Sequence, residues 1–450
     1  MRIRSMLIGL ALARAGILMA SEMPPYDLGA CIRAALHNSP DLSAAAADVA
    51  RARARLAEAK AGRLGESEYT QVLGFVNEAR GNPVFSPNDK NAVFSGLGPF
   101  TRIELDLNIP IWTFGKLDAA LKAAQEALES ERAQTEVRRA EVILSTKQLY
   151  YGLLLTQQLS AILRDMLDTM EKAVRKVQER LDAGSSAVTE LDLLKLKTGR
   201  AKFAKGVLEV DAAAALTRSA LARAIGLPLH DDFSIADRKL EPVGAALASL
   251  EAYLAQGLER RPERRQLVSG MNAQAARLDL EEAGYYPTIF LTAGVRYARA
   301  DNRTEQTNPF ANDEFNFVSP VGVLGIRWDL NFFMTHAKVE QARADLERVQ
   351  AQQRAAASGL ELEIRRAYSD VVQGRETMKA AEDGRKAGRG LLVLSVSNFD
   401  LGIGEAEELF KALGAYTEAS TDFFRAVHDY NVAVAALSKA VGAELAPLTY

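Results

Sequence analysis

The chain of 450 residues contains two copies of one structural unit, and this repeat constrains every other interpretation. The segment Ala220–Gly226 (ALARAIG) returns as Ala436–Gly442 (ALSKAVG), and Asp106–Ile109 (DLNI) returns as Asp329–Phe332 (DLNF). The second copy lies about 216 to 226 residues after the first, a drift that insertions and deletions explain. Each copy is much longer than a solenoid repeat, so it must contain several helices or strands.

Composition excludes several classes of function. The formal net charge is −3, so no nucleic-acid partner is expected. Cys31 is the single cysteine, which rules out an internal disulfide and a cysteine-based metal site, and the four histidines are scattered along the chain. No phosphate-binding loop or nucleophile motif is present. We therefore expect no catalytic residue, no metal and no cofactor, and the chain is not predicted to be an enzyme.

Residues 1–20 have the features of an export signal. Two arginines precede an apolar stretch, and Ala20 provides a cleavage point. Arg14 interrupts the apolar stretch, so an uncleaved or wrongly assigned start remains an alternative. The residues ending at Cys31 (LGAC) look like a lipoprotein box, but charged residues and prolines separate them from the apolar stretch. Cys31 is instead expected to pack as a small apolar side chain on a helix.

Hydrophobic periodicity divides both copies into the same elements. We expect repeat 1 over 21–230, a linker or equatorial segment over 231–246, and repeat 2 over 247–445. Each copy should begin with helices broken at a proline, continue with two strands and end in a long helical hairpin. The predicted ranges are helices 28–62, strands about 66–76 and 100–113 and hairpin 117–226, then helices 247–284, strands about 287–299 and 318–333 and hairpin 336–442.

The predicted strands alternate between apolar and polar residues. The polar positions are Arg102, Glu104, Asp106, Asn108, Arg327, Asp329 and Asn331. Such alternation fits a soluble sheet packed on helices, or a membrane barrel wall with apolar residues facing lipid and polar residues facing a lumen. The recurring ionisable residues and the aromatic residues near the strand ends favour the barrel. We therefore predict that these polar residues line a barrel lumen.

After each strand pair comes a helical stretch of about 65 residues, which would extend roughly 100 Å. Each stretch ends at a glycine, Gly184 or Gly402, that can take the left-handed conformation of a helix C-terminus. Four strands from one chain cannot close a barrel, and open strand edges are not stable in lipid. The chain must therefore oligomerise, and three copies would supply twelve strands and six hairpins forming one tube.

In this order, the motifs resemble those of the TolC family of outer-membrane factors over residues 26–445. The residues that carry the resemblance are Ser39–Leu42 (SPDL), Leu107–Pro110 (LNIP), Gly184 with Glu190 and Leu191, Gly402 with Glu408 and Leu409, and the closing Tyr430, Asn431, Leu437 and Gly442. The resemblance implies a mainly α fold with a β-barrel portion, in which a homotrimer forms a 12-stranded outer-membrane β-barrel and a periplasmic α-helical barrel. It also implies outer-membrane lipid, a periplasmic adaptor (membrane fusion) protein and an inner-membrane transporter as partners, in the outer membrane of a Gram-negative bacterium.

Two features depart from the family's pattern. The proline that usually opens the first strand is Pro287 in repeat 2, whereas Gly65 stands at the matching place in repeat 1. At the second tip, Glu408 and Lys411 occupy the positions of two aspartates known from the family. The family's complete ring of cation-binding aspartates at the periplasmic opening is therefore not expected in this chain.

The expected function is the exit duct of a tripartite efflux or type I secretion system, which passes solutes from an inner-membrane transporter to the exterior without chemistry. The alternative is a structural or adaptor-like periplasmic coiled-coil protein without a channel. Long hairpins alone fit that alternative, but the alternating strands would then have no purpose. A tunnel wall contacts solutes only transiently, so we expect the pump to select the cargo.

Small residues form the two hairpin tips and would let another helical hairpin approach closely. We predict that this adaptor-docking surface consists of Gly184, Ser185, Ser186, Gly402, Ile403 and Gly404. In the alternative interpretation the glycines merely end the helices.

Glu405, Glu408 and Lys411 are candidates for a periplasmic gate. The two acids lie three residues apart and share a helical face, and three chains would bring such carboxylates near the axis. Like charges held close raise carboxyl pKa values and attract cations. We expect Arg180 or Lys411 to pair with acids on a neighbouring hairpin and hold the gate closed. Alternatively, the acids only complement the dipole at the start of a helix.

Overall fold

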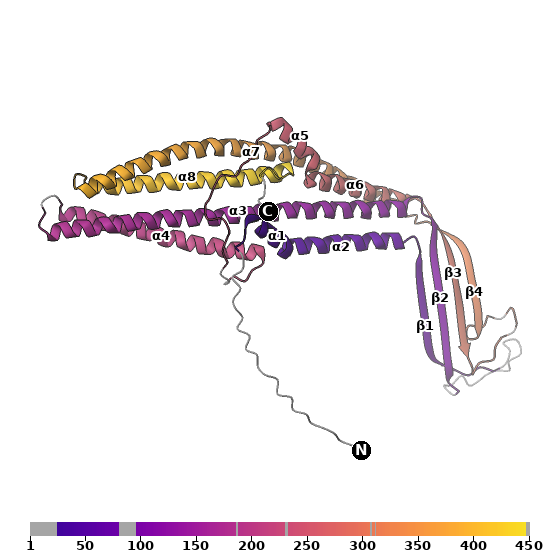
Figure 1. Cartoon of the computed structure of the whole chain (residues 1–450). Coiled ribbons are helices and arrows are strands. Elements are labelled where there is room, and N and C mark those ends of the chain that lie inside the picture. Colours follow the sequence, from indigo (N-terminus) through magenta and orange to yellow (C-terminus); the bar gives the residue numbers. More distant parts are fainter. Residues whose placement is uncertain are drawn as a thin grey trace, which may run out of the picture.

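The computed structural model describes residues 25–80, 96–185, 188–229, 233–306, 308–310 and 312–446. The predicted export signal lies outside these residues, as does Ser186 of the first tip. Figure 1 shows long helices lying side by side with a four-stranded sheet at one end. The described chain passes through the same order of elements twice, so the predicted internal repeat of strand pair and helical hairpin is confirmed.

Each copy begins with two helices separated by a proline. In the first copy, α1 (Leu28–Asn38) and α2 (Pro40–Ala61) meet at Ser39, whose hydroxyl accepts a 3.3 Å hydrogen bond from the N–H of Leu42. In the second copy, α5 (Leu250–Arg260) is followed by α6 (Pro262–Glu282) and a short 3-10 turn, Ala283–Tyr285. Proline fits the first turn of a helix because an N–H there would have no intrahelical acceptor.

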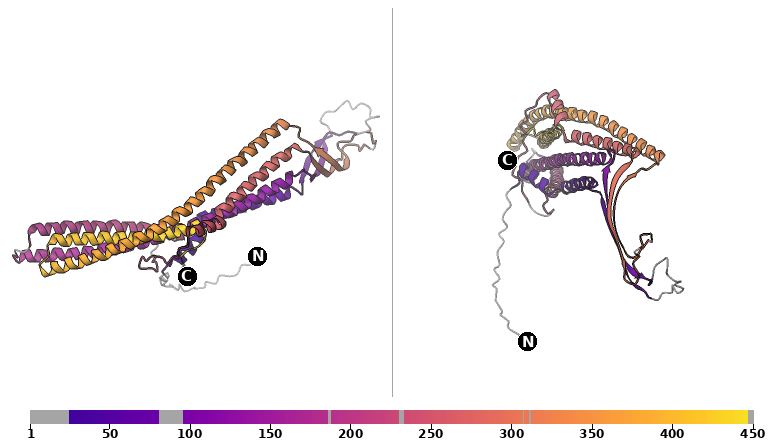
Figure 2. Two further views of the ribbon diagram at one scale, coloured as in Figure 1. Left: turned by 90° about the horizontal axis from the view of Figure 1, so that it is seen from above. Right: turned by 90° about the vertical axis from the view of Figure 1, so that its right-hand side faces the viewer.

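The two hairpins contain most of the helical residues. Helix α3 (Lys116–Asp182) returns as α4 (Glu190–Ile225), and α7 (Phe332–Leu401) returns as α8 (Ala406–Val441). Helix α8 packs against both α3 and α4, so the hairpins lie side by side from the middle of the molecule to their tips (Figure 2). None of the described helices is long and apolar enough to cross a membrane.

The strands form one antiparallel sheet in the order β1-β2-β3-β4. Its members are β1 (Glu66–Val76), β2 (Gly98–Trp112), β3 (Thr288–Ala300) and β4 (Phe317–Arg327). The two copies join where β2 pairs with β3, with Leu105 opposite Val295. In the described chain β1 pairs only with β2, and β4 only with β3, so both outer edges of the sheet are open.

The fourth strand ends earlier than predicted. β4 stops at Arg327, whereas the alternation predicted a strand to residue 333. Arg327 pairs with Thr288, the first residue of β3, and Pro287 just before it has no N–H with which to extend the ladder. The alternating residues beyond Arg327 therefore have no strand to pair with. Two predicted lumen residues consequently lie in the connection to α7, namely Asp329 and Asn331.

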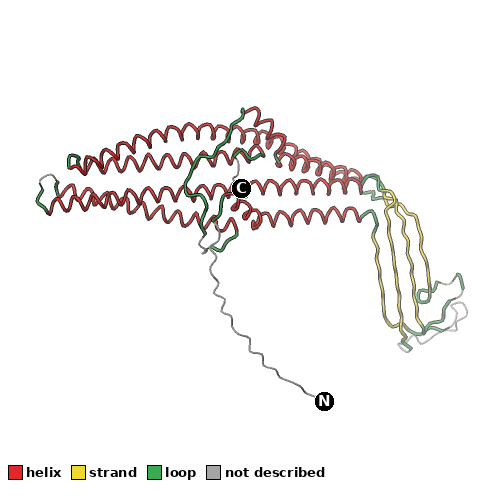
Figure 3. Tube along the Cα trace, in the orientation of Figure 1, coloured by secondary structure: helices red, strands yellow, loops and turns green. Residues whose placement is uncertain are grey.

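A segment across the middle of the bundle ties the two copies together. Residues 233–249, called the strap below, run from the end of the first hairpin to α5 and cross the helices as a loop (Figure 3). Tyr150 on α3 donates a 2.7 Å hydrogen bond to Asp237, and Asn431 on α8 holds the strap by two further bonds. The strap also buries Phe233, Ile235 and Leu240 in a cluster that includes Cys31.

Candidate functional site: the hairpin tips and the polar face of the sheet

The first tip is a tight turn that requires a glycine. Helix α3 ends at Asp182, and Gly184 takes a φ of +69°, a left-handed conformation that side chains disfavour. The N–H of Ser185 donates to the carbonyl of Arg180 at 3.0 Å and closes the turn. A Cβ added at Gly184 would meet no atom within 4 Å, so the surface of this tip is open.

The second tip is held more tightly. Gly402 ends α7 with a φ of +82°, and the N–H groups of Ile403 and Gly404 both donate to the carbonyl of Asn398 at 3.0 Å. A Cβ on Gly404 would lie 2.9 Å from the backbone nitrogen of Phe399, so only glycine fits there. The side chain of Ile403 projects into solvent and is 76% exposed.

Two groups of charges join the tips of the hairpins within one chain. Lys176 of α3 donates to the side chain of Asp400 at 2.8 Å and to its carbonyl at 2.9 Å. Lys195 of α4 contacts Glu407 of α8 at 2.6 Å, and Lys411 contacts the same carboxylate at 2.9 Å. Hydrogen bonds from Lys195 and then Lys411 lower the pKa of Glu407 to about 2.

The predicted gate residues lie at this tip and make contacts within their own chain. Lys411 pairs with Glu407 on its own helix. Arg180 lies with its guanidinium 5.8 Å from the centre of the Phe399 ring, a cation–π contact. Pairing with acids on a neighbouring hairpin stays a prediction. Glu405 precedes the first residue of α8 without capping it, and Glu408 is exposed one turn later.

The residues that join the hairpins are absent from the sites predicted from the sequence. Glu407 and Lys411 are four residues apart on α8, so their pairing could have been read from helical spacing. The contacts of Lys195 with Glu407 and of Lys176 with Asp400 span more than 200 residues, and nothing in the local sequence indicates them.

A hydrophobic cluster lies directly behind these charges. It draws residues from all four helices of the hairpins, and its fully buried members include Met170, Leu196, Leu409 and Leu413. A Cβ on Gly199 of α4 would lie 2.7 Å from the ring of Phe410 on α8, so the two helices approach closely at this point. The tips of one chain therefore form a packed unit.

The sheet has one face with most of its charged side chains, on which Val72 and Val323 are also exposed, and one apolar face. Residues paired across antiparallel strands point to the same side, and the ladders connect Arg102, Glu104, Asp106, Asn108 and Arg327 on one face. On this face Thr292 donates to the side chain of Asn108 at 2.6 Å. The opposite face carries large apolar side chains that are exposed in the single chain: Tyr69, Leu73, Phe75, Leu105, Val295, Val318, Leu324 and Ile326.

The structure also bears on the predictions about metal binding and about Cys31. Among the described residues, no group of three or more His, Cys, Asp or Glu side chains is arranged to hold a metal ion. Cys31 is fully buried on α1, and burial raises the pKa of its thiol to about 12. The thiol therefore stays protonated and packs as a small apolar side chain, as predicted.

Comparison with known proteins agrees with this architecture. The family model described as outer membrane efflux protein matches residues 31–226 and 253–443. The pyoverdine export outer membrane protein OpmQ of Pseudomonas aeruginosa is 27% identical over 307 residues, which are 66% of this chain and 61% of that protein. The match thus spans less than two thirds of this curated relative's length.

Solved structures of outer-membrane channels share the fold. The channel OprN has a TM-score of 0.75 at 18% identity, covering 93% of this chain and 91% of that one. The CmeC channel of Campylobacter jejuni has a TM-score of 0.76 at 16% identity, covering 93% and 86%. The family match places the chain in the outer membrane of a Gram-negative bacterium, with its helices on the periplasmic side. The chain belongs to the outer membrane efflux protein family.

Proposed function

We propose that the protein is the exit duct of a tripartite efflux or type I secretion system and passes solutes to the exterior without chemistry. The observation that carries the proposal is the two-faced sheet. Its exposed apolar face matches the hydrocarbon of a bilayer, and its charged face matches a water-filled lumen. A periplasmic coiled-coil protein without a channel would leave that apolar face in water, which is unfavourable.

The open edges of the sheet argue for a homotrimer. Unpaired strand edges cannot remain in lipid, because their N–H and C=O groups would have no partners. If β4 of one chain pairs with β1 of the next, three chains form a closed ring of twelve strands from the four in each chain. The six hairpins then continue the ring as a tube toward the inner membrane.

Planar-bilayer recording tests the duct. The parent trimer should conduct weakly because its tips are closed, and the variant Lys195→Gln/Glu407→Gln should give larger and more frequent current steps. Lys205→Gln/Glu209→Gln is the matched control, because that ion pair lies within α4 and joins no hairpins. Intact trimers that give no conductance in either the parent or the loosened variant would refute the duct.

We propose that the two tip turns dock a periplasmic adaptor protein, which in turn binds an inner-membrane transporter. The turns expose small residues around Gly184 and Gly402, with open space at the first. Replacing both glycines with phenylalanine should abolish export and leave trimers in the outer membrane. The matched pair of Asn substitutions tolerates the left-handed backbone while staying small, so it should export normally. Normal export by the Phe pair would rule out docking at the turns.

Glu405 and Glu408 are proposed to line the periplasmic gate. Both carboxylates are exposed in the single chain, at the start of α8 beside the second tip. Replacing both with Gln should change the conductance and its block by divalent cations. If the pair only complements the helix dipole, the variant would instead show a small loss of stability and an unchanged current.

A further inference from the structure

The connection between β3 and β4 folds back over the polar face of the sheet. Ala298 and Ala300 are at the end of strand β3 and lie on the same face as Arg102. Each of them is only 1% exposed. Other positions on this face, such as Asn108, are exposed in the single chain. The described residues 312–316 therefore cover the proposed lumen wall at the end of the sheet farthest from the helices.

Four side chains hold this segment against the wall. The guanidinium of Arg303 lies 3.9 Å from the centre of the Phe315 ring, and Phe315 meets Phe100 of β2 edge-on at 5.5 Å. Arg102 lies 6.0 Å from the Phe100 ring and donates a 3.2 Å hydrogen bond to the carbonyl of Glu314. We call Phe100, Arg102, Arg303 and Phe315 the mouth clasp.

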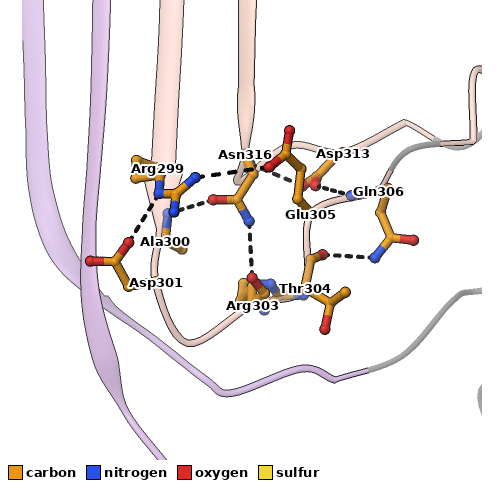
Figure 4. A network of polar contacts seen from close by, with 9 residues as sticks. All are labelled: Arg299, Ala300, Asp301, Arg303, Thr304, Glu305, Gln306, Asp313 and Asn316. Atoms are coloured by element: carbon orange, nitrogen blue, oxygen red, sulfur yellow. Dashed lines mark hydrogen bonds and ion pairs between the residues drawn. The ribbon is translucent and has the colours of Figure 1, made fainter.

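Hydrogen bonds and ion pairs join the described residues of the connection, as Figure 4 shows. The side chain of Asn316 is buried, accepts a 2.9 Å hydrogen bond from the N–H of Ala300 and donates to the carbonyl of Arg303. The carboxylate of Asp313 accepts from the N–H groups of Gln306, Phe315 and Asn316. These bonds fix the position of the Phe315 backbone, so its inward direction is built into the connection.

The same connection is attached to the first strand pair. Asn302 donates to the carbonyls of Val76 and Gly96 at 2.7 and 2.8 Å, and Arg303 donates to the carbonyl of Asn77 at 3.1 Å. The strand ends of both copies are thus tied together beside the clasp.

We propose that the mouth clasp narrows the external opening of the duct and sets the size of molecule that can pass it. This inference rests on the proposed duct, because only a closed ring of strands gives the polar face a lumen. Three chains would direct three copies of Phe315 and Arg102 inward at one level. A cation–π and aromatic contact of this kind is weak enough to open during transport.

Size-dependent labelling of a lumen cysteine tests the clasp. Asn108→Cys places a thiol on the polar face toward the helices, and native Cys31 is buried and should not react. Cells lacking their general porins are treated from outside with a small and a polymer-linked impermeant maleimide. Phe315→Ala and Arg102→Gln should each speed up labelling by the large reagent about tenfold and change the small reagent little.

Matched control variants distinguish loss of the mouth clasp from a general loosening of the barrel. Arg299→Gln changes a neighbouring arginine on the other face of β3, which pairs with Asp301 and Glu305 rather than with a member of the mouth clasp, so labelling should stay at the parent rate. Phe315→Tyr keeps the ring and should also behave as the parent. Heat-modifiable migration of each variant checks that the trimer is folded.

Three results would contradict the inference. An unchanged rate for the large reagent in both folded variants would show that the clasp does not limit passage. An equal increase for both reagents would indicate loosening rather than a size limit. If neither reagent labels any folded variant, although the denatured protein reacts, the polar face lines no lumen and the duct itself is refuted.

Discussion

Replacing Asn431 with alanine should release the strap from the second hairpin. Asn431 lies on α8 and is only 1% exposed. Its side-chain oxygen accepts from the N–H of Val243 at 2.9 Å, and its nitrogen donates to the carbonyl of Glu241 at 2.9 Å. Both partners are backbone groups of the strap, so one substitution removes two anchors between the copies.

The size of the effect follows from the two backbone groups of the strap that lose their hydrogen-bond partners. The two strap groups are part-buried, and a buried N–H or C=O that loses its partner costs about 1–3 kcal/mol, so local opening of the strap should become easier by at most about 2–6 kcal/mol. Even the lower value raises the open population about 30-fold. Water entering the site would offset part of the cost, so the lower value is the one to test.

Limited trypsin digestion reports this opening. Arg238 and Lys239 are exposed on the strap, two residues ahead of the first anchored carbonyl. Cleavage there divides the chain into halves of similar size, and its rate follows the open population when closing is fast. Asn272→Ala is the control, because Asn272 makes a single 3.4 Å bond between helices away from the strap. A cleavage rate equal to that of the parent would refute the anchoring role of Asn431.

Three further predictions test the faces of the sheet, the tip charges and the tip core. Leu105→Arg should block trimer insertion, since arginine on a lipid-facing strand costs about 2–4 kcal/mol, whereas Asp106→Arg on the polar face should insert normally. Because the pKa of Glu407 is lowered to about 2 from its usual 4.5, its stabilising contact is complete above about pH 4.5 and is lost as pH falls toward 2. Tip crosslinking should therefore differ between the parent and Glu407→Gln at neutral pH and converge in acid. Leu413→Ala in the buried tip core should destabilise the protein by about 2–5 kcal/mol in denaturant unfolding, and a loss near zero would contradict its packing there.

Most of the fold could be predicted from the alternation of polar and apolar residues in the strands and from the residues that end the helices. Both signals depend only on residues close together in the sequence. The alternation around Leu105 has a period of two and predicts the two faces of the sheet. Each tip glycine predicts the left-handed turn that ends its helix. The error at β4 has a different origin. The sequence alternates beyond Arg327, but a strand exists only where a partner does, and β3 begins at Thr288.

The contacts at the tips and the mouth could not be predicted from one sequence. Glu407 resembles any acid in the first turn of a helix until α4 brings Lys195 beside it. Phe315 stands in a polar connection without periodicity, and its contact with Phe100 depends on how the described part of that connection folds back. Such contacts join residues far apart in the chain, so spacing carries no information about them.

The departure of repeat 1 from the family pattern has a physical cause in the way each copy enters its sheet. In repeat 2 the 3-10 turn Ala283–Tyr285 leads through Pro287 into β3, and proline's fixed φ suits that extended entry. In repeat 1 the chain turns at Gly65 with a φ of +85°, which proline cannot adopt. A Cβ at Gly65 would also overlap the backbone of Asn108 on β2. Strand β1 is an edge strand with one partner in the chain, and this close approach fixes its first residue against β2.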